Sequence, residues 1–291
     1  MYYRRYVILV VFLTLVLLHK NLGAQDFEVA PVKLEFNAEP GENQTKTITV
    51  RNHSNKKESF LIVMSDFLPS SSGAINYLAP NSTKRSCANW LNINPSFFEL
   101  NPNDEIPIQI SMMVPNDQYS AAWCVIYIQS AQEQSSWNAE KNLGTGMIVT
   151  GRIGLLIYQS PKSNTNHSLK ISNLVEVTKL GDKERVFSAT IENLGEKITK
   201  SKAYLIASNM KTAEEKQLPP SEFEVFPKLS RTIELRLPNL LVPGSYSLAA
   251  ILDYGTKYSL EGTQIIIEVK EQTNIVKPDT IIVKSDTLKV K

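Results

Sequence analysis

Residues 106–114 read Ile-Pro-Ile-Gln-Ile-Ser-Met-Met-Val, with an apolar residue at every second position from Ile106 onward. Successive side chains of a β-strand point to opposite faces, so this alternation is typical of a strand with one buried face. Similar short runs rich in Val, Ile, Thr, Tyr and Phe lie between clusters of Asn, Gly, Pro and Ser along the whole chain. The sequence therefore predicts an all-β fold.

The predicted strands fall into two series that repeat each other. In the first series we expect strands at 29–36, 45–51, 58–66, 90–94, 106–114, 123–129 and 147–158. In the second we expect strands at 169–177, 185–192, 201–208, 231–237, 246–253 and 264–269. Residues 98–102 (Phe-Glu-Leu-Asn-Pro) are similar to residues 223–227 (Phe-Glu-Val-Phe-Pro), and each motif precedes an alternating strand. Such a duplication predicts two tandem immunoglobulin-like β-sandwich domains, at 25–160 and 161–269.

The two copies differ by an insertion in the first. Residues 50–52 (Val-Arg-Asn) match residues 191–193 (Ile-Glu-Asn) at a larger offset than the later motifs, so the first copy holds about sixteen extra residues. Residues 67–88 are rich in Ser, Asn and Pro and are interpreted as a loop that contains the insertion. Tyr119 and Tyr246 each lead a predicted strand, where a tyrosine corner is expected.

Both ends of the chain differ from this pattern. Residues 1–24 have a basic start, an apolar run at 6–18 and small residues before Gln25, which is typical of a secretory signal peptide. An uncleaved anchor is the alternative, but the run is shorter than a membrane span, and no later segment is apolar enough to span. Residues 270–291 are rich in Lys, Asp and Thr and are expected to form a flexible tail. Strand propensity at 280–283 leaves open that the tail pairs with an edge strand.

Charge and residue content exclude several functional classes. The formal net charge is +2, and it falls to −1 without the basic residues Arg4, Arg5 and Lys20, so we expect no nucleic-acid partner. Only His53 and His167 lie beyond the signal, both in predicted turns, and the acidic residues are scattered. We therefore expect no enzyme activity, no catalytic residue, no metal site and no cofactor.

Cys87 and Cys124 are the only cysteines. Because an exported protein meets an oxidising compartment, we expect them to form a disulfide that ties the insertion to the strand carrying Cys124. Closing this loop would add about 4 kcal/mol to the free energy of unfolding. Two free buried thiols are the alternative, since cysteine also packs as a small apolar residue. Trp90 and Trp123 are expected to pack in the core beside the pair.

Several motifs of the first copy resemble a known family. They are residues 29–36 (Val-Ala-Pro-Val-Lys-Leu-Glu-Phe), 47–52 (Thr-Ile-Thr-Val-Arg-Asn) and 153–161 (Ile-Gly-Leu-Leu-Ile-Tyr-Gln-Ser-Pro). Together they resemble the first domain of periplasmic pilus chaperones of the PapD type. Residues 90–95 (Trp-Leu-Asn-Ile-Asn-Pro) also look like the Ig-like domains of WxL-interacting proteins. Over the second copy the resemblance is limited to the architecture.

The resemblance implies a binding mechanism. In that family the last strand of the first domain pairs with an incomplete subunit, and two basic residues hold the subunit's terminal carboxylate. Lys33 matches the basic position of the first strand, whereas Leu155 stands where the second is expected, and Arg152 is the nearest basic residue. Ile153, Leu155 and Ile157 alternate along the last strand and could present apolar side chains to an incoming chain. A strand facing its own core is the alternative.

From these features the sequence predicts a bacterial periplasmic or envelope protein that binds other envelope or secreted proteins. Edge-strand pairing, as in a chaperone, is the expected mechanism. The alternative is a structural or adhesive component of a surface assembly, located at the cell surface or outside the cell.

Overall fold

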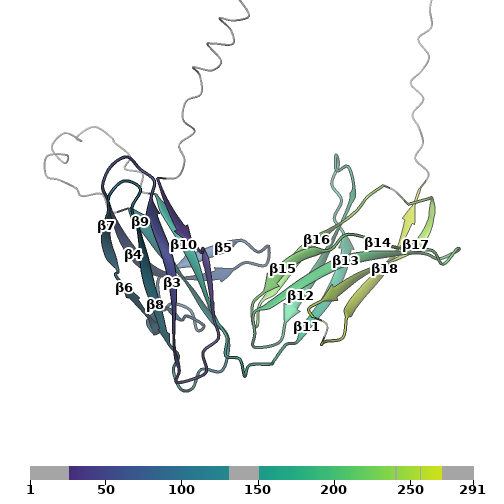
Figure 1. The fold of residues 1–291 in the computed structure, drawn as a ribbon. Coiled ribbons are helices and arrows are strands. Elements are labelled where there is room, and N and C mark those ends of the chain that lie inside the picture. Colours follow the sequence, from purple (N-terminus) through teal and green to yellow (C-terminus); the bar gives the residue numbers. More distant parts are fainter. Residues whose placement is uncertain (1–25, 131–150, 240, 256, 271–291) are drawn as a thin grey trace, which may run out of the picture. The chain divides into compact units, whose positions relative to one another are not determined.

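The computed structural model describes residues 26–130, 151–239, 241–255 and 257–270 of the chain. The predicted signal peptide and, after Lys270, the predicted tail lie outside these residues. The described part is built from β-strands, together with one short 3-10 helix, η1 (Ala88–Trp90) (Figure 1). Nowhere in this part does a helix have the length and apolarity that crossing a membrane requires.

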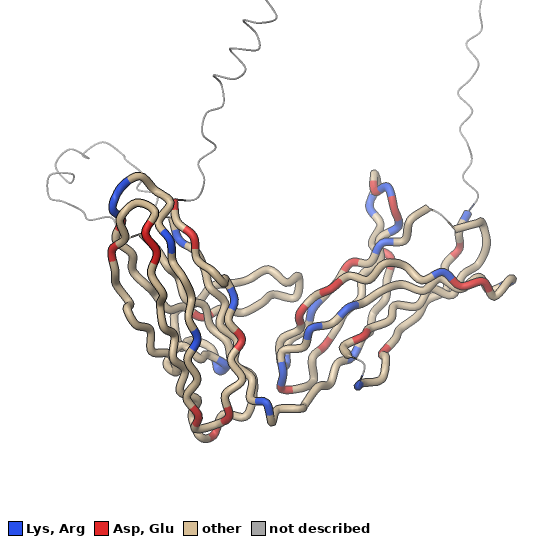
Figure 2. Tube along the Cα trace, viewed as in Figure 1, with Lys and Arg blue, Asp and Glu red and all other residues tan. Residues whose placement is uncertain are grey.

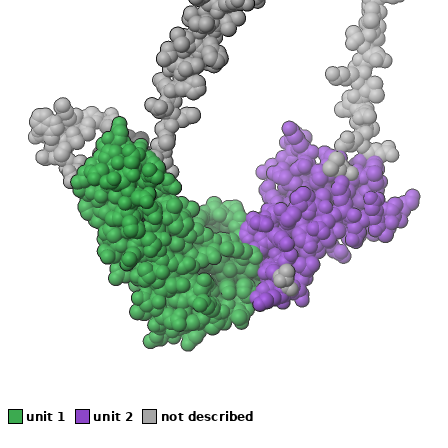
Figure 3. All heavy atoms as spheres, viewed as in Figure 1, with its two compact units in different colours: residues 1–169, 192–200, 224–232 green, residues 170–191, 201–223, 233–291 purple. Residues whose placement is uncertain are grey.

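The chain divides into two compact units (Figure 3). Unit 1 takes the described residues up to Leu169 and two later segments, Glu192–Lys200 and Glu224–Thr232. Unit 2 consists of Lys170–Ile191, Ser201–Phe223 and the described residues from Ile233 onward. The predicted domain boundary between residues 160 and 161 was derived from the internal repeat. The two units are defined by packing instead, so they do not test this boundary, and it stays a prediction. Lys and Arg lie interspersed with Asp and Glu over the described parts of both units (Figure 2), in keeping with the small net charge.

Two sheets form a sandwich in the first part of the chain. The first sheet has the order β1 (Phe27–Ala30), β3 (Asn43–Asn52), β8 (Glu105–Met113) and β6 (Leu91–Asn94). The second has the order β2 (Lys33–Phe36), β10 (Arg152–Gln159), β9 (Ala122–Ser130), β4 (Glu58–Pro69) and β5 (Ile75–Leu78), with β7 (Phe97–Leu100) also paired to β4. Between them Ile48, Ile108, Ile110 and Ile126 are fully buried. The alternation of residues 106–114 thus marks a core strand, as predicted.

The later strands also form two sheets. One has the order β11 (Leu169–Glu176), β12 (Arg185–Asn193) and β16 (Ser230–Leu237). The other has the order β14 (Glu215–Gln217), β13 (Thr199–Asn209), β17 (Gly244–Asp253) and β18 (Glu261–Val269), with β15 (Ser221–Val225) paired to β13. Leu205, Leu248 and Leu252 are buried in this part. The predicted all-β architecture of two sandwiches is confirmed.

The first predicted strand, at 29–36, is in fact two strands in different sheets. β1 pairs antiparallel with β3, whereas β2 pairs parallel with β10. Pro31, which lies between them, has no N–H to donate, so the chain cannot continue a ladder there. This change of sheet brings Lys33 beside β10.

The insertion at 67–88 is more ordered than the predicted loop. β4 runs on to Pro69 and forms a hairpin with β5. The buried carboxylate of Asp66 accepts hydrogen bonds from the Ser86 hydroxyl at 2.6 Å and from the Thr83 amide at 3.0 Å. Since a buried carboxylate needs such partners, Asp66 holds the end of the insertion against β4.

Two buried asparagines occupy equivalent positions in the repeat. The Asn52 side-chain amide donates to the carbonyl four residues later at 2.9 Å and to the Leu100 carbonyl at 3.0 Å. Asn193 makes the same pair of bonds, at 2.8 Å four residues later and at 2.9 Å to Val225. In each copy a buried amide thus joins a strand end to the motif that the sequence shares.

The tyrosine-corner prediction is confirmed for one residue and wrong for the other. The Tyr246 hydroxyl donates to the Val242 carbonyl at 3.0 Å, and its ring is buried. Tyr119 is 64% exposed and has no such bond among the described contacts. The Tyr119 ring does not reach a core. Tyr119 and Tyr246 thus hold equivalent positions in the repeat, but only Tyr246 makes the tyrosine-corner hydrogen bond.

Cys87 and Cys124 are both buried, with their sulfur atoms 3.2 Å apart as free thiols. The disulfide is therefore not formed in this structure, although the two side chains face each other, and the pairing stays a prediction. Burial raises the pKa of the Cys87 thiol well above its ordinary value. Since the thiolate is the form that reacts, oxidation is expected to be faster during folding than after it. Trp90 packs against this core, whereas Trp123 points to the opposite face of β9.

We predict that Asn52→Ala and Asn193→Ala each lower the free energy of unfolding by about 2–4 kcal/mol. Each change leaves buried carbonyl groups without a donor. Asn92→Ala, at an exposed position of β6, is the matched control and should change stability by less than about 0.5 kcal/mol. Urea unfolding of the three variants measures the difference, and equal values for buried and exposed positions would contradict the role of the amides.

We also predict that protein refolded in a glutathione redox buffer has no free thiols after denaturation, whereas protein refolded under reducing conditions has two. In the latter, alkylation of the native state should be slow because both sulfurs are buried. Intact-mass measurement after alkylation counts the thiols. Two reactive thiols in the oxidatively refolded protein would favour the alternative of a reduced pair.

Candidate functional site

Strand β10 is paired unequally on its two sides. It pairs antiparallel with β9 over its whole length, from Arg152 to Gln159. On the other side it pairs with β2 only from Leu156 onward, where Leu156 lies opposite Lys33. Among the described residues no strand pairs with residues 152–155 on that side. The first half of β10 is therefore open on its β2 side, although β10 is an interior strand of the sheet.

The direction of the main-chain groups follows from the pairing. The Leu156 amide donates to the Val32 carbonyl at 3.1 Å, so Leu156 points its main-chain groups toward the β2 side. Because these groups alternate along a strand, the N–H and C=O of Arg152 and Gly154 point the same way. Those of Ile153 and Leu155 point toward β9. The open edge thus presents two donors and two acceptors.

The side chains predicted to bind a partner face the sandwich core instead. Leu155 and Ile157 are fully buried, and Ile153 is half-buried and packs against the same core. The predicted row of exposed apolar side chains is therefore not present on β10 in this structure. The alternation of Ile153, Leu155 and Ile157 shows that these side chains share one face of the strand, but it does not reveal whether that face is covered. A binding role for this strand remains a prediction and would depend on its main chain.

Lys33 already has carboxylate partners within unit 1. Its Nζ lies 2.6 Å from Glu224 Oε1 and 3.0 Å from Glu35 Oε1, and it stands over the Tyr158 ring at 4.3 Å from the centroid. Burial alone would lower the pKa of Lys33, but the hydrogen bonds to Glu224 and Glu35 outweigh it and raise the pKa. The Tyr158 hydroxyl donates to Glu224 Oε2 at 3.2 Å. Lys33 is thus part of an internal ion-pair group.

Arg152 lies at the open half of β10. Its Cζ is 4.4 Å from the centroid of the Tyr127 ring, a cation–π contact. Lys33 is in register with Leu156, four residues along the strand from Arg152, which is roughly 13 Å. The structure therefore does not bring the two basic residues together, and the carboxylate site implied by the resemblance is not assembled here.

Strand β9 is covered on both faces, and its second face was not recognised from the sequence. Trp123, Val125 and Tyr127 belong to a second apolar cluster on the face away from the sandwich core. The Trp123 indole N–H donates to the Phe67 carbonyl at 2.9 Å, and its ring meets Phe226 at 4.9 Å between centroids. The full cluster comprises Phe67, Trp123, Val125, Tyr127, Tyr158 and Phe226. It packs the hairpin of the insertion and the segment Glu224–Thr232 within unit 1.

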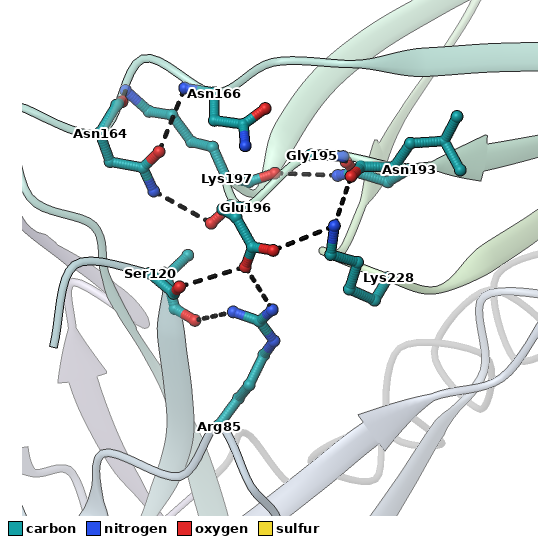
Figure 4. Close-up of polar contacts among 11 residues, drawn as sticks. Arg85, Ser120, Asn164, Asn166, Asn193, Gly195, Glu196, Lys197 and Lys228 are labelled. Carbon is teal, nitrogen blue, oxygen red and sulfur yellow. Dashed lines mark hydrogen bonds and ion pairs between the residues drawn. The ribbon is translucent and has the colours of Figure 1, made fainter.

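A polar cluster around Glu196 lies in the same unit (Figure 4). Glu196 accepts from Arg85 at 2.6 Å and from the Ser120 hydroxyl at 3.1 Å, and Lys228 Nζ lies 3.0 Å from its other oxygen. Burial alone would raise the pKa of Glu196, but the hydrogen bonds from Arg85 and Lys228 outweigh it and lower the pKa to about 2. Arg85 also donates to the Ala121 carbonyl at 3.1 Å.

This cluster holds segment Glu192–Lys200 within unit 1. Arg85 and Glu196 are 111 residues apart in the sequence, and each stands there next to a lysine, Lys84 and Lys197, in a polar stretch. No pattern in the sequence could have paired them. Their contact depends on how the loops pack.

We predict that Glu196 stabilises the fold in a pH-dependent way. Its pKa in the folded protein, about 2, lies below the unfolded value of about 4.5, so its contribution is complete above pH 4.5 and is lost as the pH falls toward 2. Glu196→Gln should cost about 1–2 kcal/mol at pH 6, allowing for partial exposure, and little at pH 2.5. Urea unfolding at both pH values measures this. Glu222→Gln, at an exposed position of unit 2, is the control and should change stability little at either pH. A cost of Glu196→Gln that does not change with pH would contradict the prediction.

Comparisons with known proteins give matches among solved structures alone. No protein-family model matches the sequence, and no curated protein matches it. A chain from the chaperone–tip adhesin complex of CFA/I fimbriae biogenesis is 13% identical, with a TM-score of 0.49, over 82% of this chain and 97% of that one. The class 5 fimbriae chaperone CfaA is 12% identical, with a TM-score of 0.44, over 84% and 100%.

The Escherichia coli chaperone DraB is 11% identical, with a TM-score of 0.39, over 84% of this chain and 98% of that one. These matches cover most of this chain at 11% to 13% identity, and they concern the fold alone.

Proposed function

We propose that the protein is an exported binding protein of a bacterial envelope, acting in the periplasm, that captures partner polypeptides by strand pairing with the open half of β10. The observation that supports this most directly is the unequal pairing of that strand. β9 covers one side completely, whereas β2 covers the other only from Leu156 onward. A half-open edge of this kind accepts an extended chain by main-chain hydrogen bonds.

The partner's side chains would then contribute specificity. The side chains of an incoming strand beside Arg152 and Gly154 would alternate between the two faces of the sheet. Those on one face would lie next to Ile153 and the core, and those on the other face would lie next to Arg152. The lack of a side chain at Gly154 is important here, because a Cβ at this position would lie only 3.3 Å from the Tyr127 ring. The partner expected from this geometry is another envelope or secreted protein with an unpaired, apolar strand.

We predict that Arg152→Pro abolishes capture while Arg152→Ala preserves it. Proline removes the Arg152 N–H on the open side and leaves the β9 ladder intact, whereas alanine removes only the side chain. Immobilised wild-type protein and both variants are incubated with envelope extract, and bound proteins are quantified by mass spectrometry. A specific partner should be retained by the alanine variant and fall about tenfold or more with proline, equivalent to about 1.4 kcal/mol.

Hydrogen exchange of the complex provides the positional check. Binding should slow exchange of the Arg152 and Gly154 amides, while the Ile153 and Leu155 amides, already paired with β9, should change little. Circular dichroism and urea unfolding confirm that the proline variant is folded. Equal capture by the proline variant, or protection confined to another strand, would disprove pairing at β10.

A further inference from the structure

Strand β18 is the border of its sheet in unit 2. It pairs with β17 through nine residues, from Glu261 to Val269, and no other described strand pairs with it. Near the end of β18 the Arg185 guanidinium donates to the Glu268 carbonyl at 3.0 Å. That carbonyl is therefore not free to accept a hydrogen bond from another strand. Residues 263–267 are left as a continuous open edge. This edge is separate from β10, and an inference about it is independent of the proposed function.

The open edge of β18 is unusually apolar. It carries three consecutive isoleucines, and Ile266 is 67% exposed on the outer face. Ile267, on the other face, is only 6% exposed, so both faces of this edge are apolar at neighbouring positions. Proteins usually protect a long apolar edge with charge, proline, a bulge or a covering segment, because it otherwise pairs with other chains. In residues 263–267 none of the side chains is charged and none is proline.

The sequence beyond the described residues contains a segment of matching pattern. Residues 280–284 read Thr-Ile-Ile-Val-Lys, close to the Thr-Gln-Ile-Ile-Ile of residues 263–267. If Ile282 lies opposite Ile266 in an antiparallel pair, Ile281 and Val283 lie opposite Ile267 and Ile265. Apolar residues then meet on both faces of the sheet. In the same register Lys284 is opposite Gln264 and Thr280 is opposite Glu268.

The connection between the two segments is long enough for this return. Residues 270–278 would join Val269 to Asp279, whereas neighbouring strands are only about 4.8 Å apart. Pro278-Asp279 precedes the segment, and a proline there can begin a strand without losing a ladder bond. A short tether also gives the segment an effective concentration in the millimolar range, above that of any second copy. The pairing is therefore favoured within one molecule.

We propose that the C-terminal segment at 281–284 pairs antiparallel with residues 264–267 of β18 in the same molecule and covers its edge. The segment adds a further strand to the sheet and shields Ile266 from other chains. An edge closed in this way is not available for pairing with other chains.

A pair of engineered cysteines tests the register. Ile266→Cys with Ile282→Cys places two thiols opposite each other on one face, and mild oxidation should link them within a monomer. Ile266→Cys with Ile281→Cys is the matched control, because adjacent residues of a strand point to opposite faces. The native cysteines are both buried, and adding Cys87→Ala and Cys124→Ala to both double variants removes them from the assay. Peptide mapping identifies the bond, and gel mobility separates monomers from dimers.

Hydrogen exchange of the full chain tests the cover without engineered thiols. We predict that the outward-facing amides of residues 263–267 exchange at least about tenfold faster in Ile282→Pro than in the wild type, because proline disrupts the added strand. Thr287→Pro, outside the segment, is the control and should leave exchange unchanged.

The outcomes separate the alternatives. A fast intramolecular link for the 266–282 pair, together with faster exchange in Ile282→Pro, supports the proposal. Equal linking of both cysteine pairs, or exchange that does not respond to Ile282→Pro, would overturn it. A link found in dimers alone would also overturn it, because the segment would then cover the edge of a second copy.

Discussion

The burial of β9 on both faces is the constraint on which the rest of unit 1 depends. One face belongs to the sandwich core through Cys124, Ile126 and Ile128, and the other belongs to the cluster around Trp123. A strand with two apolar faces must be covered on both sides. The second cover comes from the insertion, through Phe67, and from the segment that carries Phe226. The insertion and the segments Glu192–Lys200 and Glu224–Thr232 therefore belong to one packed unit, and the polar contacts of Glu196 and Lys33 follow from it.

The same packing determines what β10 can offer to a partner. Its apolar side chains are buried in the core, and Lys33 is ion-paired with Glu224 and Glu35. The resemblance implies a row of exposed apolar side chains and a basic residue free to bind a carboxylate, and neither is available in this structure. The main chain of the first half remains open, because β2 reaches only to Leu156. A main-chain edge recognises extended structure more than a particular sequence. A protein that binds through such an edge can accept several related partners.

Edges also differ in how they are protected. β10 begins at Arg152, a charged residue that discourages unspecific pairing, whereas the open part of β18 has no charge of its own. The apolar pattern at 280–284 complements that uncharged edge. Covering the uncharged edge of β18 would keep it from pairing with other chains, while the open half of β10 stays accessible to a partner.

The sequence alone determined the secondary-structure class, the duplication and the position of the insertion, because period-two alternation and repeated motifs are local properties. It also identified residues 50–52 and 191–193 as equivalent, and the buried amides of Asn52 and Asn193 make equivalent bonds. Only the tertiary structure decided which face each strand covers. Leu155 turned inward, Trp123 lay opposite Cys124, and Tyr119 stayed exposed while Tyr246 formed its corner. Alternation defines two faces, but the segments that cover them, such as the one carrying Phe226, come from about a hundred residues away and leave no local signal.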